Sequence, residues 1–294
     1  MPALTQEARA KVNLTLRVVG RRVDGYHDLE SVVAFADCAD SLSLTPGSSL
    51  NLAATGPLAQ ACGEPEDNLV FKAAQLLSER VPDLVLGDFI LDKVLPVAAG
   101  IGGGSADAAA ALRLLAQAND LELDDPRLIE VARLTGADVP VCLASNACVM
   151  TGVGDTLQPL SLPKMPCVMV NPRIAVATQD VFKALGLRNG QLLVSATDVL
   201  RGTAWPEAGA SLEDWVEALA AGSNDLEAPA IRIQPVIGEV LAALSASNGA
   251  WLARMSGSGA TCFAIYENTA DARRAAQQIQ TDHPGWWVHA GVLS

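Results

Sequence analysis

Apolar residues alternate with polar ones in some stretches of the chain and recur at every third or fourth position in others. Alternation predicts half-buried strands, and the longer spacing predicts helices with one buried face. On this basis we predict strands at residues 12–19, 41–44, 88–93, 167–170, 250–255, 260–266 and 287–292. Helices are predicted at residues 68–80, 106–118, 127–135, 179–185, 212–221, 236–247 and 270–281. The mixture predicts an α+β protein.

Two prolines mark the expected division of the chain. Pro159 and Pro163 lie in the connection between the two halves, and domain boundaries fall in such linkers. We therefore predict an N-terminal domain at residues 1–160 and a C-terminal domain at residues 161–294. Residues 188–213 are rich in small and polar side chains and predict a mobile connection or an insertion.

Composition and charge argue against several classes of protein. Half of the 294 residues are hydrophobic, which indicates a globular protein, and the net charge of −13 argues against a nucleic-acid partner. The first twelve residues lack an apolar stretch, and the apolar window 97–118 contains charged residues. We therefore expect no secretory signal, no membrane span and a cytoplasmic protein. The six cysteines have no Cys-x-x-Cys spacing and predict buried, reduced thiols.

The segment from Pro96 to Ser105 contains four glycines directly before a predicted helix. Glycines let the backbone approach a ligand, and the free N–H groups of a helix N-terminus favour an anion. The segment predicts a phosphate cradle or, equally, a flexible turn. No Gly-Lys-Ser/Thr follows, so the Walker pattern is absent. The acidic pair about 20 residues later precedes Pro126 between two helices, which weakens a dinucleotide-binding interpretation.

Two charged residues are candidates for catalysis. Asp138 follows Gly136, the expected left-handed cap of helix 127–135, in a loop that Pro140 stiffens and in which Val139 is expected to be extended. Such a carboxylate either accepts a proton from a substrate hydroxyl or is simply solvated. Lys11 lies at the start of a predicted strand within a basic N-terminal segment, residues 1–22, that could compensate a polyanion. Its apolar neighbours favour an inward orientation.

Three further segments could hold a ligand. Tyr26 and His27 end a polar loop and could stack on a nucleobase, although such residues are more often structural. Residues 256–259, Ser-Gly-Ser-Gly, predict a tight hairpin turn or a backbone nest for phosphate. His283 and His289 lack metal-ligand spacing and are assigned to surface and strand. A metalloenzyme built on protein ligands alone is disfavoured.

The order of these motifs along the chain resembles that of the GHMP family of small-molecule kinases. The matching motifs are Lys11 with Asn13, Gly25-Tyr-His27, the glycine-rich segment, Gly136-Ala-Asp138-Val-Pro140 and Met255-Ser-Gly-Ser-Gly259. The sequence Gly-Arg-Arg-x-Asp-Gly-Tyr-His at residues 20–27 points to the branch of the family that acts on a cytidylyl substrate. The resemblance implies an N-terminal α/β domain with the glycine loop, a C-terminal ferredoxin-like domain and an active site in the cleft between them.

The resemblance also implies an activity and residue roles. The expected reaction is ATP-dependent phosphorylation of the 2-hydroxyl of 4-diphosphocytidyl-2-C-methyl-D-erythritol, in the non-mevalonate isoprenoid pathway. Independently of the resemblance, we expect a monomer or weak dimer. Asp138 matches the general base and Lys11 the lysine that orients it. Mg²⁺ would accompany ATP, with Ser105 as a weak candidate ligand. ATP-binding matches are Pro96, Val97, Ala98, Ala99, Gly100, Ile101, Gly102, Gly103, Gly104, Ser105 and Ala106. Substrate-binding matches are Asn13, Tyr26, His27, Phe182, Gly257, Ser258 and Gly259.

The glycine-rich segment departs from the family pattern in two respects. Ala98 and Ala99 occupy positions where glycines are common, and we expect both to adopt ordinary negative φ. Asp107 occupies a position where asparagine is common, in what we expect to be the first turn of the helix, and we expect it to point away from the nucleotide.

Two alternative functions remain. One is a GHMP kinase for another alcohol, of the homoserine or mevalonate type, for which Tyr26 and His27 would have no base to stack on. The other is a non-catalytic nucleotide-binding protein, which would be expected to lack Lys11 or Asp138.

Overall fold

The computed structural model describes residues 2–193 and 204–294, which group into two compact units. The first unit contains Met1–Lys11, Cys38–Val97 and Gly102–Ser145, and the second contains Val12–Asp37, Ala98–Ile101 and Asn146–Ser294. Each unit is therefore discontinuous in sequence. These units do not coincide with the predicted domains, residues 1–160 and 161–294, and that domain division stays a prediction. Part of the segment 188–213 for which we expected a connection, namely residues 194–203, lies outside the described residues.

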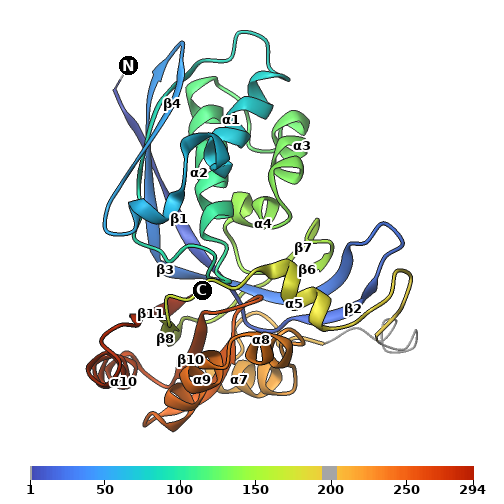
Figure 1. The fold of residues 1–294 in the computed structure, drawn as a ribbon, viewed down its shortest axis with the longest axis vertical. Coiled ribbons are helices and arrows are strands. Elements are labelled where there is room, and N and C mark those ends of the chain that lie inside the picture. Colours follow the sequence, from blue (N-terminus) through green and yellow to red (C-terminus); the bar gives the residue numbers. More distant parts are fainter. Residues whose placement is uncertain (1, 194–203) are drawn as a thin grey trace. The chain divides into compact units, whose positions relative to one another are not determined.

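The first unit combines a sheet with a layer of helices (Figure 1). Strand β5 (Leu86–Asp92) pairs antiparallel with the second half of β3 (His27–Gly47) and parallel with β4 (Leu50–Thr55), while β1 (Leu4–Asn13) pairs with β3. Short 3₁₀ helices, η1 (Ala59–Cys62) and η2 (Pro65–Asp67), connect the sheet to the helices. The helices are α1 (Leu69–Ser78), α2 (Gly103–Ala118), α3 (Pro126–Thr135) and α4 (Val139–Ala144).

Helix α2 is the central helix of this layer because most of its side chains are small. It packs against α1, α3 and α4, and its alanines are almost all buried. Alanine combines the highest helix propensity with a side chain short enough for close helix packing. The neighbouring helices begin with side-chain caps from Asn68 and Asp125, which satisfy backbone N–H groups at the helix start.

The second unit contains an antiparallel sheet in the order β9-β10-β8-β11. Its strands are β8 (Met165–Asn171), β9 (Ala250–Met255), β10 (Cys262–Tyr266) and β11 (Trp287–Leu293). Helix α9 (Val236–Ala246) connects β8 to β9 and α10 (Thr269–Asp282) connects β10 to β11, and both pack on the sheet. The βαββαβ order and the strand order are those of a ferredoxin-like fold. The remaining helices are α5 (Thr178–Ala184), α7 (Leu212–Ala220) and α8 (Glu227–Ile233).

The N-terminal hairpin also belongs to the second unit. Strand β2 (Arg17–Arg21) pairs antiparallel with the first half of β3, which pairs on its other side with β6 (Cys148–Gly152). β6 continues into a hairpin with β7 (Thr156–Pro159). The core of the unit joins Leu16 and Val18 to the apolar faces of the ferredoxin-like sheet and helices.

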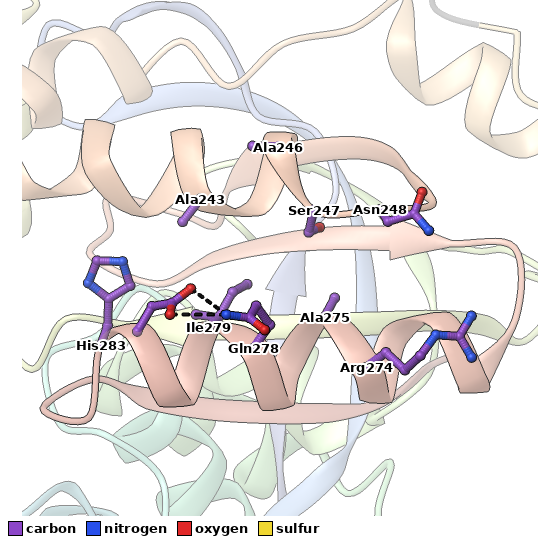
Figure 2. A pocket seen from close by; sticks show the side chains of 10 residues that line it. Ala243, Ala246, Ser247, Asn248, Arg274, Ala275, Gln278, Ile279 and His283 are labelled. Carbon is purple, nitrogen blue, oxygen red and sulfur yellow. Dashed lines mark hydrogen bonds between the residues drawn. The ribbon is translucent and has the colours of Figure 1, made fainter.

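A groove of about 570 Å³ lies between α9 and α10, as Figure 2 shows. Ala243, Ala246 and Ala275 leave the space open, and the Gln278 amide donates to both oxygens of Asp282 at one side. None of the residues predicted for the functional site lines this groove.

Most predicted elements are present, with differences at their boundaries. The predicted strand 12–19 is wrong, because β1 ends at Asn13 and β2 begins at Arg17. Helix α2 begins at Gly103 instead of residue 106, because glycines were assigned to the loop. Strands β4, β6 and β7 and helices α4 and α8 were not predicted, and neither were residues 4–11 of β1 or the part of β3 outside residues 41–44. The five elements missed entirely have six residues or fewer apart from α8, which contains Pro229. None of the described helices is long and apolar enough to span a membrane.

Candidate active site

Lys11 and Asp138 form an ion pair within the first unit. Lys11 Nζ lies 3.0 Å from Asp138 Oδ2, and the two side chains are 4% and 36% exposed. The lysine is therefore held inward, as its apolar neighbours indicated, while the carboxylate still reaches solvent. An accessible carboxylate beside a buried cation is an arrangement that can accept a proton from a bound hydroxyl.

The backbone elements under this pair fix its geometry. Lys11 lies near the end of β1, and Asp138 is the residue directly before α4. Arg113 of α2 joins the two elements, because its guanidinium donates to Cys142 O in α4 at 2.9 Å and to Glu7 O in β1 at 2.8 Å. Burial lowers the pKa of Arg113. The backbone carbonyls of Cys142 and Glu7 accept hydrogen bonds from the buried guanidinium and so compensate part of the cost of burying it. The ion pair is thus built on elements that a third helix holds together.

Two local expectations about this region are wrong. Gly136 has a φ of 179° and is extended, not left-handed. Val139 is not extended, because it is the first residue of α4 and Pro140 occupies the first turn of that helix. A proline fits there, since the N–H that it lacks would have had no partner within the helix. The Asp138 side chain does not cap α4, so its carboxylate is not used by the helix start.

The glycine-rich segment contributes residues to both units. Gly102, in the first unit, precedes α2 with a φ of 63°, and a Cβ there would lie 3.1 Å from Lys11 Cε. Glycine is required at this position by both the backbone conformation and the lysine stem. In the second unit Ala98 has a φ of 50°, which corrects our expectation that both alanines adopt ordinary φ. A non-glycine residue keeps a left-handed conformation only where its surroundings impose it.

In the second unit, Ser256 connects Asn13 to the glycine-rich segment. Its buried hydroxyl accepts a hydrogen bond from Asn13 N at 3.0 Å and donates one to Gly100 O at 2.9 Å. The Asn13 amide donates to Ser31 Oγ at 2.7 Å. Gly100 has a φ of 75°, and a Cβ there would lie 2.5 Å from Ser256 O. The predicted turn at residues 256–259 therefore packs directly on Gly100.

Two residues that the sequence did not reveal, Asn224 and Thr178, hold this turn, and a third, Arg254, anchors the strand β9 that leads into it. Asn224 donates to Met255 O and Gly257 O at 2.7 and 2.8 Å, and Thr178 shares a 2.8 Å hydrogen bond with Ser258. Arg254, whose pKa burial lowers, donates to carbonyls of residues 14, 219 and 222. Asn224 and Thr178 lie outside any sequence motif, and Arg254 is one polar position in a predicted strand. Only the fold therefore shows that these three side chains lie around β9 and the turn that follows it.

His27 stacks on Phe182, with ring centroids 4.4 Å apart and an interplanar angle of 24°. Burial, and then the charge of Arg21, lower the pKa of His27, which favours the neutral ring. Its Nε2 atom is buried and has no hydrogen-bond partner among the described residues. Tyr26 is 63% exposed and does not join this pair. The structure therefore brings together two of the three aromatic residues proposed for one ligand.

A buried cluster of three charged residues lies at the base of the glycine-rich segment in the first unit. Lys93 Nζ lies 2.6 Å from both Asp40 Oδ2 and Asp107 Oδ2. Burial raises the pKa of Asp107 to about 7, although the charge of Lys93 opposes this. Burial lowers the pKa of Lys93, but the two carboxylates outweigh it and raise the value overall. One ammonium group can neutralise only one of the two carboxylates. Asp107, whose pKa is raised, is therefore the carboxylate that holds a proton most easily.

Asp107 is the fifth residue of α2 rather than part of its first turn, because the helix begins earlier than expected. Its side chain is turned to Lys93 within the first unit; that it points away from the nucleotide stays a prediction. Cys142, Cys148, Cys167 and Cys262 are buried, as expected, whereas Cys38 and Cys62 are only half-buried, which corrects the expectation for these two. Among the described residues, no group of three or more His, Cys, Asp or Glu side chains could hold a metal ion.

The comparisons with known proteins agree with this organisation. Two family models match the chain, the GHMP kinases N terminal domain at residues 68–146 and GHMP kinases C terminal at residues 208–284. A relative from Bradyrhizobium diazoefficiens, 4-diphosphocytidyl-2-C-methyl-D-erythritol kinase, is 74% identical over 100% of this chain and 99% of its own length. The chain belongs to the GHMP kinase family. A GHMP kinase of the same name from Rhodopseudomonas palustris is 72% identical over 99% of this chain and 97% of its own.

Solved structures of GHMP kinases confirm the two-domain α+β fold. A crystal structure of 4-(cytidine 5'-diphospho)-2C-methyl-D-erythritol kinase has a TM-score of 0.76 and 35% identity, covering 99% of both chains. A homoserine kinase from Cytophaga hutchinsonii has a TM-score of 0.72 at 17% identity, covering 100% of this chain and 95% of its own, and shows the fold alone. The expected active site in the cleft between the domains stays a prediction.

Proposed function

We propose that the chain is an ATP-dependent kinase that phosphorylates the 2-hydroxyl of 4-diphosphocytidyl-2-C-methyl-D-erythritol. The observation that carries this proposal is the Lys11–Asp138 ion pair in a chain 74% identical to a relative with that name. The pair also argues against a non-catalytic nucleotide-binding protein, which has no need of a buried lysine beside an accessible carboxylate.

In the proposed reaction, Asp138 accepts the proton of the 2-hydroxyl as the hydroxyl oxygen bonds to the γ-phosphorus of ATP. The bond from that phosphorus to the β–γ bridging oxygen breaks, and ADP leaves with the electron pair. Lys11 holds the Asp138 carboxylate at 3.0 Å and its charge stabilises the developing alkoxide. Phosphoryl transfer needs mainly alignment and charge neutralisation, and these two side chains supply part of each.

The remaining predicted residues bind the two substrates. We assign the nucleotide phosphates to the segment from Pro96 to Ala106, whose end is the N-terminus of α2. Asn13 contacts the methylerythritol end of the acceptor. The turn Gly257 to Gly259 lies near the phosphates and the acceptor, which its contact with Gly100 supports.

The cytosine is assigned to His27, Phe182 and Tyr26. The stack of His27 on Phe182 and the unpartnered Nε2 atom support this, because a nucleobase offers both an aromatic face and polar ring atoms. These features also favour a cytidylyl substrate over homoserine or mevalonate, which have no ring to stack.

Mg²⁺ is proposed to enter with ATP. Ser105, half-exposed in the first turn of α2, offers one hydroxyl, and Mg²⁺ needs few protein ligands when phosphates and water complete its shell. The ion would neutralise phosphate charge during transfer. Cytoplasmic location and a monomeric or weakly dimeric state stay predictions.

The test is ADP release by the purified protein with Mg-ATP and each of four alcohols: the cytidylyl substrate, homoserine, mevalonate and galactose. We expect turnover with the cytidylyl substrate alone. Turnover of homoserine or mevalonate in its place would contradict the acceptor. Binding of ATP without turnover of any of the four would contradict the kinase assignment and favour the non-catalytic alternative.

A further inference from the structure

The two ends of the glycine-rich segment meet at one buried ammonium group. Strand β5 ends at Asp92, and Lys93 is the next residue, three positions before Pro96. At the other end of the segment, Gly103 begins α2. A Cβ on Gly103 would lie 3.4 Å from Lys93 Nζ, so the ammonium lies against the backbone of the first residue of the helix.

Asp40 fixes the chain just before the segment. Its Oδ1 accepts hydrogen bonds from Val94 N at 2.6 Å and from Leu95 N at 2.8 Å, and its Oδ2 accepts one from Lys93 Nζ at 2.6 Å. Asp40 is fully buried. Hydrogen bonds to an ionised acceptor are short and strong, so this carboxylate determines the backbone conformation with which the chain leaves β5.

Asp107 fixes the chain just after the segment. Its Oδ2 accepts the second 2.6 Å hydrogen bond from Lys93 Nζ, one turn beyond Gly103 on α2. Its Oδ1 is buried and has no partner among the described residues. The contact of Asp107 with Lys93 therefore ties α2 to the end of β5.

We propose that Lys93, Asp40 and Asp107 form a clamp that holds the two ends of the glycine-rich segment at the spacing needed to bind nucleotide phosphates. The clamp rests on the proposed function, in which this segment binds ATP. The three residues are positioning residues and have no proposed contact with either substrate. A merely structural ion cluster would affect stability alone, whereas the clamp determines nucleotide affinity.

The decisive comparison is between Asp107→Ala and Asp107→Asn. Alanine removes the link to α2 but leaves the neutral Lys93–Asp40 pair intact, so this variant avoids leaving an unpaired buried charge. Asparagine keeps an oxygen that can accept from the ammonium. We expect Asp107→Ala to raise the Kd for Mg-ATP about tenfold or more, the size expected for losing a hydrogen bond to a charged group. We expect Asp107→Asn to restore affinity to within about threefold of wild type.

Val131→Ala in α3 is the matched stability control. Val131 is fully buried in the first unit and has no part in the proposed site, so its truncation lowers the thermal midpoint by a cavity effect without changing Kd. Calorimetric titration of each purified variant with Mg-ATP gives the Kd, and steady-state kinetics give KM for ATP and for the acceptor. We expect Asp107→Ala to raise KM for ATP and to leave KM for the acceptor unchanged.

The outcomes separate the clamp from the proposed function. A Kd for Asp107→Ala equal to that of wild type, with a midpoint lowered as in Val131→Ala, would overturn the clamp while leaving the kinase assignment intact. Equal loss of affinity in the Ala and Asn variants would overturn it as well. Failure of the wild type to turn over the cytidylyl substrate would contradict the proposed function, but the titrations with ATP would still decide the clamp.

Discussion

Lys11 Nζ lies 3.0 Å from Asp138 Oδ2, and the lysine is buried where the aspartate is one-third exposed. The two residues are 127 positions apart in sequence, and their contact depends on β1 and α4 being held together by Arg113. The contact makes Lys11 and Asp138 a candidate catalytic pair, in which Asp138 accepts a proton and Lys11 orients it.

Asp138→Asn is expected to reduce kcat by about 10²-fold or more, because an amide cannot accept the hydroxyl proton. The Kd for Mg-ATP should stay near the wild-type value, since the side chain is proposed to act on the acceptor. Steady-state kinetics and calorimetric titration measure the two quantities. Asp124→Asn, at an exposed loop position, is the control and should match wild type. A kcat within a few-fold of wild type would remove Asp138 from the mechanism.

Gly100→Ala is expected to abolish measurable nucleotide binding. A Cβ at this residue would lie 2.5 Å from Ser256 O and 2.8 Å from Gly259 N, and the φ of 75° disfavours any L side chain. Both contacts are with backbone, so no side-chain rotation relieves them. Gly285→Ala, where a Cβ meets nothing within 4 Å, is the matched control. Unchanged ATP affinity in Gly100→Ala would show that the segment does not hold the nucleotide in this conformation.

Ser256→Ala removes the hydroxyl that joins Asn13 N to Gly100 O. The loss of a buried hydrogen bond of this kind costs about 0.5–1.5 kcal/mol in the free energy of unfolding. We also expect a higher KM for the acceptor, because Asn13 is proposed to contact it. Chemical denaturation and kinetics check both effects. Loss of stability with an unchanged KM would limit Ser256 to a structural role.

His27 predicts a pH dependence. Burial, and then Arg21, lower its pKa below the ordinary value of 6.5, so the unfolded state binds the proton more tightly than the folded state. This contribution to stability is fully present above about pH 6.5 and is lost as the pH falls from there through the lower pKa of the folded state. The thermal midpoint of wild type should therefore fall more steeply than that of His27→Gln between pH 7 and pH 5. Parallel midpoint curves for the two proteins would contradict the shift.

His27 should also affect acceptor binding. Truncation in His27→Ala removes the ring that stacks on Phe182 and should raise KM for the cytidylyl substrate with little change in kcat. Phe182→Leu keeps apolar volume but removes the aromatic face, and we expect a change in the same direction. An unchanged KM in His27→Ala would count against the proposed cytosine contact.

The sequence by itself determined most of the longer helices, the strands of the C-terminal half and the residue types of the site. Alternation and helical spacing predicted the ferredoxin-like strands and helices of the C-terminal half, because each element buries one face and its pattern is local. The motifs around Lys11, Gly100, Asp138 and Gly257 predicted the family, since their glycines and charges occur in a characteristic order. Short elements such as α4 and β7 were missed because they span too few residues to show a period.

Only the tertiary structure decided which side chains meet. The contacts of Lys11 with Asp138, of Ser256 with Asn13 and Gly100, and of Lys93 with Asp40 and Asp107 all join residues far apart or on different elements. Likewise the positive φ of Ala98 is imposed by its surroundings and contradicts local preference. Burial and ion pairing depend on packing between distant segments, whereas strand and helix patterns depend on neighbours along the chain.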